Sequence, residues 1–314
     1  MKVLADLQRW TSTGAIRPEQ HEVLSALVRK ERFSVFVELH TLLYLGVVSF
    51  IAGVGWTVQT HFQGLGDAAI LSALTLALTA SLYYCFSRGR DYSNGRVEAP
   101  GFAFDYVLYL GCLLLGIELG YLEFRFHLLK GSWDHYLLLS ACVFFLLAYR
   151  FDNRFVLSLA LSTLGGWFGV RLTSFPDIGG ASLRAGALVY GGLVAAAGAG
   201  LFGAGIKKHF LDAYLHVAAN VLFVALLSAL FQNNPHALYL PGLLGLAGLA
   251  VAAGVRFRRF AFVVYGILYG YAGISARLLH EVDSFTVGLA YIAVSSTIVI
   301  VSLVALARRF GREE

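Results

Sequence analysis

The chain has 314 residues, of which 58% are apolar and only 14% are charged. This balance, with a mean hydropathy of +0.71, excludes an ordinary soluble globular domain and predicts a membrane protein. The formal net charge is +5, but the basic residues form short clusters between apolar stretches instead of one long basic stripe. We therefore expect membrane lipid, and not nucleic acid, as the partner of this surface.

The first 33 residues are predicted to form a short helical hairpin on the cytoplasmic side. Leu4, Leu7 and Trp10 recur at helical spacing, Gly14 suits a helix C-terminus, and Pro18 suits the first turn of a second helix. One interpretation is a solubilising segment that helps to set the topology. The alternative is a docking module for a protein partner, because amphipathicity alone does not choose between the two.

Ten apolar stretches follow, each long enough to be a membrane-spanning helix. They lie near Phe36–Val58, Asp67–Phe86, Ala103–Phe124, His135–Tyr149, Phe155–Leu172, Gly186–Ile206, Leu211–Phe231, Ala237–Val255, Phe260–Leu279 and Thr286–Ala307. The predicted fold class is therefore an all-α polytopic membrane helix bundle of ten transmembrane helices, preceded by the hairpin.

The basic residues predict the orientation of this bundle. With ten spans, 19 of the 24 Lys and Arg residues fall on the side that holds both termini, and 5 fall on the other side. Short loops rich in Lys and Arg remain in the cytoplasm, so both termini are predicted to be cytoplasmic.

A weak internal similarity predicts how the bundle is organised. Arg150-Phe151 recurs as Arg256-Phe257, and Arg171-Leu172 recurs as Arg277-Leu278, both after 106 residues. One interpretation is a duplication into parallel four-helix repeats, which would meet along an axis normal to the membrane. The predicted regions are then 1–33 (hairpin), 34–102 (first transmembrane hairpin and loop), 103–210 and 211–314 (the two repeats). The alternative is coincidence, since arginine is expected at helix ends.

The N-terminal part resembles a known family. The stretches Leu7–Trp10, Gly14–Gln20, Leu45-Gly46 and Gly53–Trp56 look like those of bacterial predicted membrane proteins grouped as domain of unknown function 2157. The resemblance is clear over the hairpin and the first two spans, and continues only as a similar series of apolar helices. It implies a multi-pass protein of a bacterial inner (plasma) membrane, and it implies no reaction.

The first candidate site is an ionisable group inside the membrane. Glu118 lies within the third predicted span, and a charge at that depth costs about 2.5–3.5 kcal/mol on insertion scales. Arg171 and Arg277, at the outer ends of their spans, are expected to reach it. One hypothesis is a proton or ligand site, and the alternative is a structural ion pair or a carboxylate that reaches outward to water.

The second candidate site lies at the predicted cytoplasmic boundary. Asp105 and Asp212 are expected to pair there with Arg150, Arg154, Arg256 or Arg259. His216 follows Asp212 by one helical turn, so the carboxylate could orient the imidazole. His40 lies at a similar depth, but lone histidines are usually structural, so we expect no metal and no cofactor.

A literal motif raises a third alternative. Gly64-Leu65-Gly66-Asp67 resembles the signature of intramembrane aspartyl proteases, which need two carboxylates at close range. The only earlier aspartate is Asp6, so an aspartate that opens a helix is the simpler explanation.

From the sequence we predict a non-enzymatic scaffold or sensor whose hairpin meets a partner. The principal alternative is a small-solute or lipid transporter, with a cavity between the repeats lined by Glu118, Arg171, Arg277, Tyr109 and Tyr265. An intramembrane protease is the remote alternative.

Overall fold

The computed structural model describes residues 8–13, 17, 20, 25, 49, 53, 56, 66–127, 133–173, 180–231, 238–282 and 284–310. It divides the chain into two compact units, Met1–Ala73 and Leu74–Glu314, and each is treated by itself below.

In the first unit, residues 8–12 form a helical turn, and the Thr13 amide donates to the Arg9 carbonyl at 3.0 Å. The Arg17 amide donates to Gln20 Oε1 at 3.0 Å, which is how a side chain in the first turn of a helix reaches back to its start. This contact lies where the second helix of the hairpin is predicted to begin. The predicted span Phe36–Val58 and His40 fall almost entirely outside the described residues.

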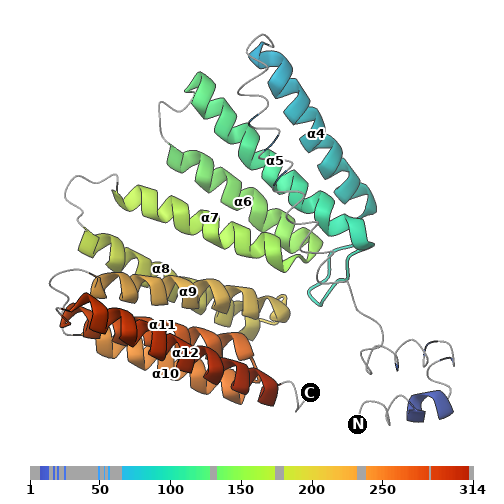
Figure 1. The fold of residues 1–314 in the computed structure, drawn as a ribbon. Coiled ribbons are helices and arrows are strands. Elements are labelled where there is room, and N and C mark those ends of the chain that lie inside the picture. Colours follow the sequence, from blue (N-terminus) through green and yellow to red (C-terminus); the bar gives the residue numbers. More distant parts are fainter. Residues whose placement is uncertain are drawn as a thin grey trace. The chain divides into compact units, whose positions relative to one another are not determined.

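The described part of the chain from residue 66 onward is helical and contains no strand (Figure 1). Its elements are α4 (Asp67–Arg88), α5 (Phe102–Phe126), α6 (Trp133–Phe151), α7 (Arg154–Thr173), α8 (Gly180–Gly203), the 3₁₀ helix η1 (Lys208–Phe210), α9 (Leu211–Leu230), α10 (Tyr239–Arg256), α11 (Phe260–His280) and α12 (Phe285–Phe310). Nine helices among the described residues are long and apolar enough to cross a membrane. The predicted polytopic all-α fold is confirmed.

These nine helices correspond to the second to tenth predicted spans. Most observed bounds lie within three residues of the predicted ones, because the apolar runs end where arginines and turn residues begin. The largest difference is at α8, which begins at Gly180 and not near Gly186. Ser182 and Arg184 interrupt the apolar run there without breaking the helix.

In the second unit, three antiparallel hairpins pack most extensively: α6 with α7, α8 with α9, and α10 with α11. Helix α9 also contacts α7, α10 and α11, so it is the helix around which the C-terminal part is built (Figure 1). Its buried positions include Ala213, Ala218, Phe223 and Ala225.

The turns after α6 and α10 have the same backbone form. Asp152 and Arg258, 106 residues apart, adopt positive φ angles of 57° and 54°. The next amide in each turn donates to a carbonyl five residues back: Asn153 to the Ala148 carbonyl at 3.1 Å, and Arg259 to the Gly254 carbonyl at 2.8 Å. The duplication stays a prediction, but these two turns match at the shift seen in the sequence.

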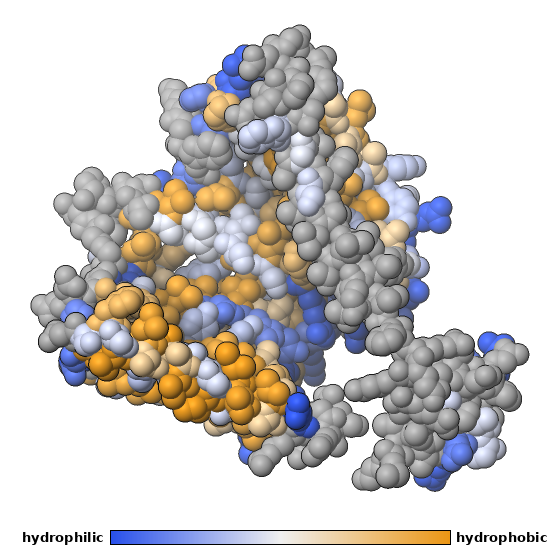
Figure 2. Space-filling model, viewed as in Figure 1, coloured by the Kyte–Doolittle hydropathy of each residue, from blue (hydrophilic) through white to orange (hydrophobic). Residues whose placement is uncertain are grey.

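Apolar side chains cover the outside of the helices, as expected when lipid is the solvent. In α12, Val294, Ile298 and Val301 are each at least 60% exposed. Figure 2 shows a broad apolar surface where Figure 1 places α11 and α12.

The loops α4–α5, α6–α7, α8–α9 and α10–α11 meet at one end of the second unit. Three contacts connect this end: Lys207 N donates to the Asn94 carbonyl of the α4–α5 loop, Lys207 Nζ pairs with Asp152 of the α6–α7 loop, and Arg259 of the α10–α11 loop pairs with Asp212 at the start of α9. We call this the basic end, because it contains Arg88, Arg90, Arg96, Arg150, Arg154, Lys207, Lys208, Arg256, Arg258 and Arg259. The other end, with Arg125, Arg171, Arg184 and Arg277, is called the opposite end.

Candidate functional site

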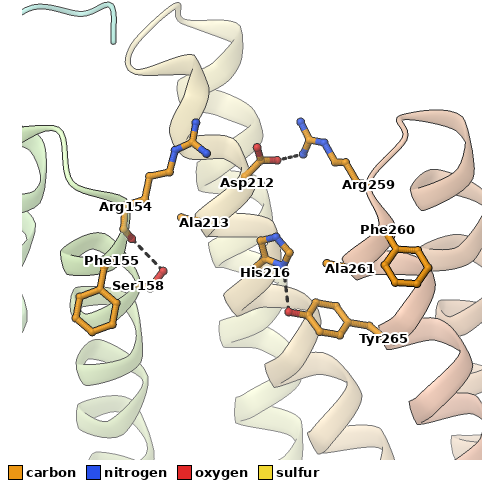
Figure 3. Close-up of a pocket in the computed structure, with 10 residues that line it drawn as sticks. All are labelled: Arg154, Phe155, Ser158, Asp212, Ala213, His216, Arg259, Phe260, Ala261 and Tyr265. Carbon is orange, nitrogen blue, oxygen red and sulfur yellow. Dashed lines mark hydrogen bonds and ion pairs between the residues drawn. The ribbon is translucent and has the colours of Figure 1, made fainter. Parts of the chain in front are cut away.

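A cavity of about 530 Å³ opens at the basic end among α7, α9 and α11 (Figure 3). Its wall is formed by Arg154, Phe155 and Ser158 of α7, by Asp212, Ala213 and His216 of α9, and by Arg259, Phe260, Ala261 and Tyr265 at the start of α11. We call it the α7–α9–α11 pocket. Helix α7 belongs to the first predicted repeat and the other two to the second, so the pocket lies between the predicted halves.

The charges of the pocket are unevenly paired. Arg259 NH1 forms an ion pair with Asp212 Oδ1, and both side chains keep about a third of their surface exposed. Arg154 stands on the facing wall, and its guanidinium makes no hydrogen bond or ion pair with the residues that the structure describes (Figure 3). With two guanidiniums and one carboxylate, the pocket has one positive charge in excess when His216 is neutral.

Two helix starts add to this positive character. Helix α7 begins at Arg154, with its first turn capped because the Val156 amide donates to Asn153 Oδ1 at 3.0 Å. Helix α11 begins at Phe260 without any side-chain cap. The first turn of a helix carries a partial positive charge, so both starts favour a negative group beside them.

The floor of the pocket is a polar row shared by α9 and α11. His216 Nδ1 lies 3.2 Å from the Tyr265 hydroxyl, and the imidazole stacks on Phe262 with ring centroids 4.7 Å apart. One turn deeper, the Tyr269 hydroxyl donates to Asn220 Oδ1 at 2.9 Å. Tyr269 in turn stacks on the fully buried Phe223, where the polar row ends.

Asp212 and His216 both line this pocket, as their spacing suggested, but they do different things. The expected contact in which Asp212 orients the imidazole is wrong, since Tyr265 is the hydrogen-bond partner of His216 and Arg259 is the partner of Asp212. The predicted pairing of Asp212 with a boundary arginine is therefore present.

The other boundary residues form a separate network. Asp105 Oδ1 accepts a hydrogen bond from Asn153 Nδ2 at 2.9 Å, and the same amide nitrogen donates to the Tyr109 hydroxyl at 3.1 Å. Asp105 thus has an amide partner in place of the expected arginine. Arg150 donates to the Arg90 carbonyl at 2.6 Å, and Arg256 is exposed at the end of α10.

A buried charge cluster that no sequence pattern indicated lies beside the pocket. Asp152 and Lys207 are fully buried, with Lys207 Nζ 3.3 Å from Asp152 Oδ2. His209 Nε2 contacts the other carboxylate oxygen, and the Val97 amide donates to Oδ2. These residues join the loops before α7 and α9, so they set the distance between two walls of the pocket. They stand in turns more than 50 residues apart, where no spacing along one helix could reveal them.

The intramembrane arginine site expected around Glu118 is wrong. At the opposite end, Arg171 pairs with Asp134 at 3.4 Å, and Arg277 pairs with Glu281, four residues further along α11, at 2.8 Å. Each arginine thus pairs with a carboxylate at the same end of the helices: Asp134 is at the start of α6, and Glu281 follows the end of α11. Of the five residues expected to line a cavity, Glu118, Arg171, Arg277, Tyr109 and Tyr265, only Tyr265 lines the α7–α9–α11 pocket, and the expected cavity stays a prediction.

Glu118 instead meets a hydroxyl. Thr75 Oγ1 of α4 donates to Glu118 Oε1 at 2.5 Å. The second oxygen, Oε2, is buried and has no hydrogen-bond partner among the described residues.

Two further expectations concern chemistry. Asp67 is the first residue of α4, which agrees with an aspartate that opens a helix, and it does not line the pocket. Within the described ranges, no group of three or more His, Cys, Asp and Glu side chains is placed to hold a metal ion.

Comparison with known proteins supports the resemblance found in the sequence. Residues 8–157 match the family model described as predicted membrane protein, DUF2157. The match supports assigning this chain to the DUF2157 family. It covers the segment through α6 and the first turn of α7, including Glu118 and Asp152, while the α9 and α11 walls of the pocket lie beyond it. No curated protein and no solved structure matches the chain.

Proposed function

We propose that this protein binds an anionic group, a phosphate or a carboxylate, in the α7–α9–α11 pocket, and acts as a membrane sensor of the molecule that carries it. The observation that supports this most strongly is the Arg154 guanidinium, which faces a cavity of about 530 Å³ and has no anionic partner in the described part of the chain. Guanidinium groups bind phosphate and carboxylate oxygens through two parallel hydrogen bonds.

Arg259 is the second cationic group of the proposed site. The side chain of its present partner, Asp212, is about a third exposed, so an incoming anion can compete with it for the guanidinium. Ser158 and Tyr265 place hydroxyl groups on the same cavity, where they are bonded to the Arg154 carbonyl and to His216 Nδ1.

A lipid head group and a free solute are both sources of such an anion. The pocket lies at an end of membrane-spanning helices, the depth at which lipid phosphates lie. The phenyl rings of Phe155 and Phe260 beside the arginines suit a ligand that is partly apolar.

A sensor fits this site better than a carrier does. The polar row that starts at Asp212 ends at Phe223, so within the described residues it leads into the membrane without leading across it. The scaffold role predicted for the N-terminal hairpin, with its protein partner, stays a prediction, because most of that hairpin is outside the described residues.

For location, we propose a bacterial inner membrane with the basic end and both termini in the cytoplasm. The support is the concentration of Lys and Arg in the loops of the basic end, together with the resemblance of the N-terminal sequence to bacterial membrane proteins. The pocket would then open toward the cytoplasm.

The test compares two sources of the same anionic group on the purified protein. Thermal unfolding is followed with inorganic phosphate against chloride at equal ionic strength, and in nanodiscs of phosphatidylglycerol against phosphatidylcholine. We expect phosphate, phosphatidylglycerol or both to stabilise the protein. A response to phosphate alone identifies a free solute, and a response to phosphatidylglycerol alone identifies a lipid.

The variant Arg154→Gln is expected to weaken that binding about tenfold, the equivalent of about 1.4 kcal/mol. Its matched control is Arg256→Gln, which removes an equally basic but exposed side chain at the same end, outside the pocket. Stabilisation by neither ligand, or an equal loss in both variants, would overturn the proposal.

A further inference from the structure

Glu118 lies well inside the membrane and away from the pocket. It is eight residues before the end of α5 at Phe126, or about 12 Å of helix at about 1.5 Å per residue. Thr75, its partner, is likewise eight residues from the start of α4 at Asp67, so both side chains lie at a similar depth from the opposite end.

The described helices α4, α5 and α6 carry no cationic side chain at this depth. Between Asp67 and Arg88, α4 has no charged residue, and between Asp105 and Glu123, α5 has only Glu118. Between His135 and Arg150, α6, which packs on α5, has none either. The remaining ionisable groups are phenols and thiols: Tyr83, Tyr84 and Cys85 on α4, Tyr106, Tyr109, Cys112 and Tyr121 on α5, and Tyr136, Cys142 and Tyr149 on α6.

The two carboxyl oxygens have different surroundings. Oε1 accepts a hydrogen bond from the Thr75 hydroxyl at 2.5 Å, whereas Oε2 is buried without a donor among the described residues. An ionised carboxylate would therefore place a full charge in an apolar environment with one hydrogen bond to compensate it, which costs several kcal/mol. A neutral carboxylic acid, with Oε1 as its carbonyl oxygen and Oε2 as its hydroxyl, removes the cost of the charge and leaves the smaller cost of one buried hydroxyl without an acceptor among the described residues.

We propose that Glu118 is an intramembrane proton-binding site: its carboxyl group holds a proton on Oε2, and the Thr75 hydroxyl fixes its orientation between α4 and α5. Thr75 is exposed on the outside of α4, so the group is next to the lipid surface. This site is independent of the anion pocket, whose arginines lie at the basic end.

A carboxylic acid in lipid has a diagnostic reaction with carbodiimides. The acid transfers its proton to a carbodiimide nitrogen, and the carboxylate oxygen then bonds to the central carbon to form an O-acylisourea. Migration of the acyl group to nitrogen produces a stable N-acylurea, so the whole reagent is added and nothing is oxidised or released.

The test uses the full chain in native membranes or nanodiscs, treated with dicyclohexylcarbodiimide and, separately, with a water-soluble carbodiimide. Mass spectrometry of peptides is expected to find the lipid-soluble adduct on Glu118 and not on Glu98, an exposed carboxylate in the α4–α5 loop. The adduct should be lost in Glu118→Gln and retained in Thr75→Val, which removes the orienting hydroxyl but leaves the acid.

Infrared spectroscopy supplies a second measurement that needs no reagent. The difference spectrum between the unmodified chain and Glu118→Gln is expected to contain the carbonyl band of a protonated carboxyl group, at neutral pH and in phosphatidylcholine. An ionised carboxylate band in its place, or labelling of Glu118 by the water-soluble reagent as readily as Glu98, would overturn the proposal.

Discussion

The carboxylates at the basic end and the carboxyl group of Glu118 differ in the groups that compensate them for the loss of water. At the basic end, Asp152 has Lys207 and His209, and Asp212 has Arg259. Glu118 has one threonine hydroxyl and an oxygen without a donor in the described structure. The comparison teaches that the loops supply counter-charges from distant parts of the chain, whereas the apolar stretches of α4 to α6 supply none. A group that persists in such surroundings is a candidate for function and not for structure.

The largest expected effect comes from breaking the buried pair at the basic end. Lys207→Met leaves Asp152 buried with only His209 and the Val97 amide as partners, and the loss of one partner of a buried ion pair costs about 3–5 kcal/mol. We expect a large fall in the unfolding temperature of the protein in detergent micelles.

The matched control is Lys208→Met, the next residue, whose side chain is exposed. It should change stability by no more than about 0.5 kcal/mol. Equal stability of the two variants would mean that Asp152 and Lys207 do not fix the loops beside the pocket.

A smaller effect is expected inside the pocket. Asp212→Asn removes the carboxylate that competes for Arg259, so phosphate or phosphatidylglycerol should bind more tightly and not more weakly. Because the ion pair is partly exposed, the gain is about 0.5–1 kcal/mol, or about two- to fivefold in Kd. Titration of the ligand against thermal stability measures it, and weaker binding would show that Asp212 itself contacts the ligand.

Much of the fold could be predicted from the sequence, because apolar run length and terminal arginines specify a membrane helix almost by themselves. The start of α8 could not, since Ser182 and Arg184 are polar yet helical. The span Phe36–Val58 stays a prediction.

The candidate sites were harder to predict because their residues meet across distant helices. Asp212 and His216 were recognisable as one turn of α9, but their partners Arg259 and Tyr265 depend on how α11 packs. The expected contact between Arg171 and Glu118 rested on their depth alone. In the structure Arg171 pairs with Asp134 instead. The Asp152 cluster lies in turns, where neither hydropathy nor helical spacing indicates which residues come into contact.

The comparison between the two regions is tested most directly by water access at one position in each. Ser158→Cys places a thiol in the pocket, and Thr75→Cys places one beside Glu118. In both variants the exposed Cys142 is replaced by alanine, while Cys85 and Cys112 are buried and are kept. A membrane-impermeant maleimide, added in turn to each side of sealed vesicles, should label Ser158→Cys from one side, more slowly when the anion that stabilises the protein is present, and should leave Thr75→Cys unlabelled from both. Rapid labelling of Thr75→Cys with no labelling of Ser158→Cys would contradict both the open anion pocket and the lipid-surrounded acid.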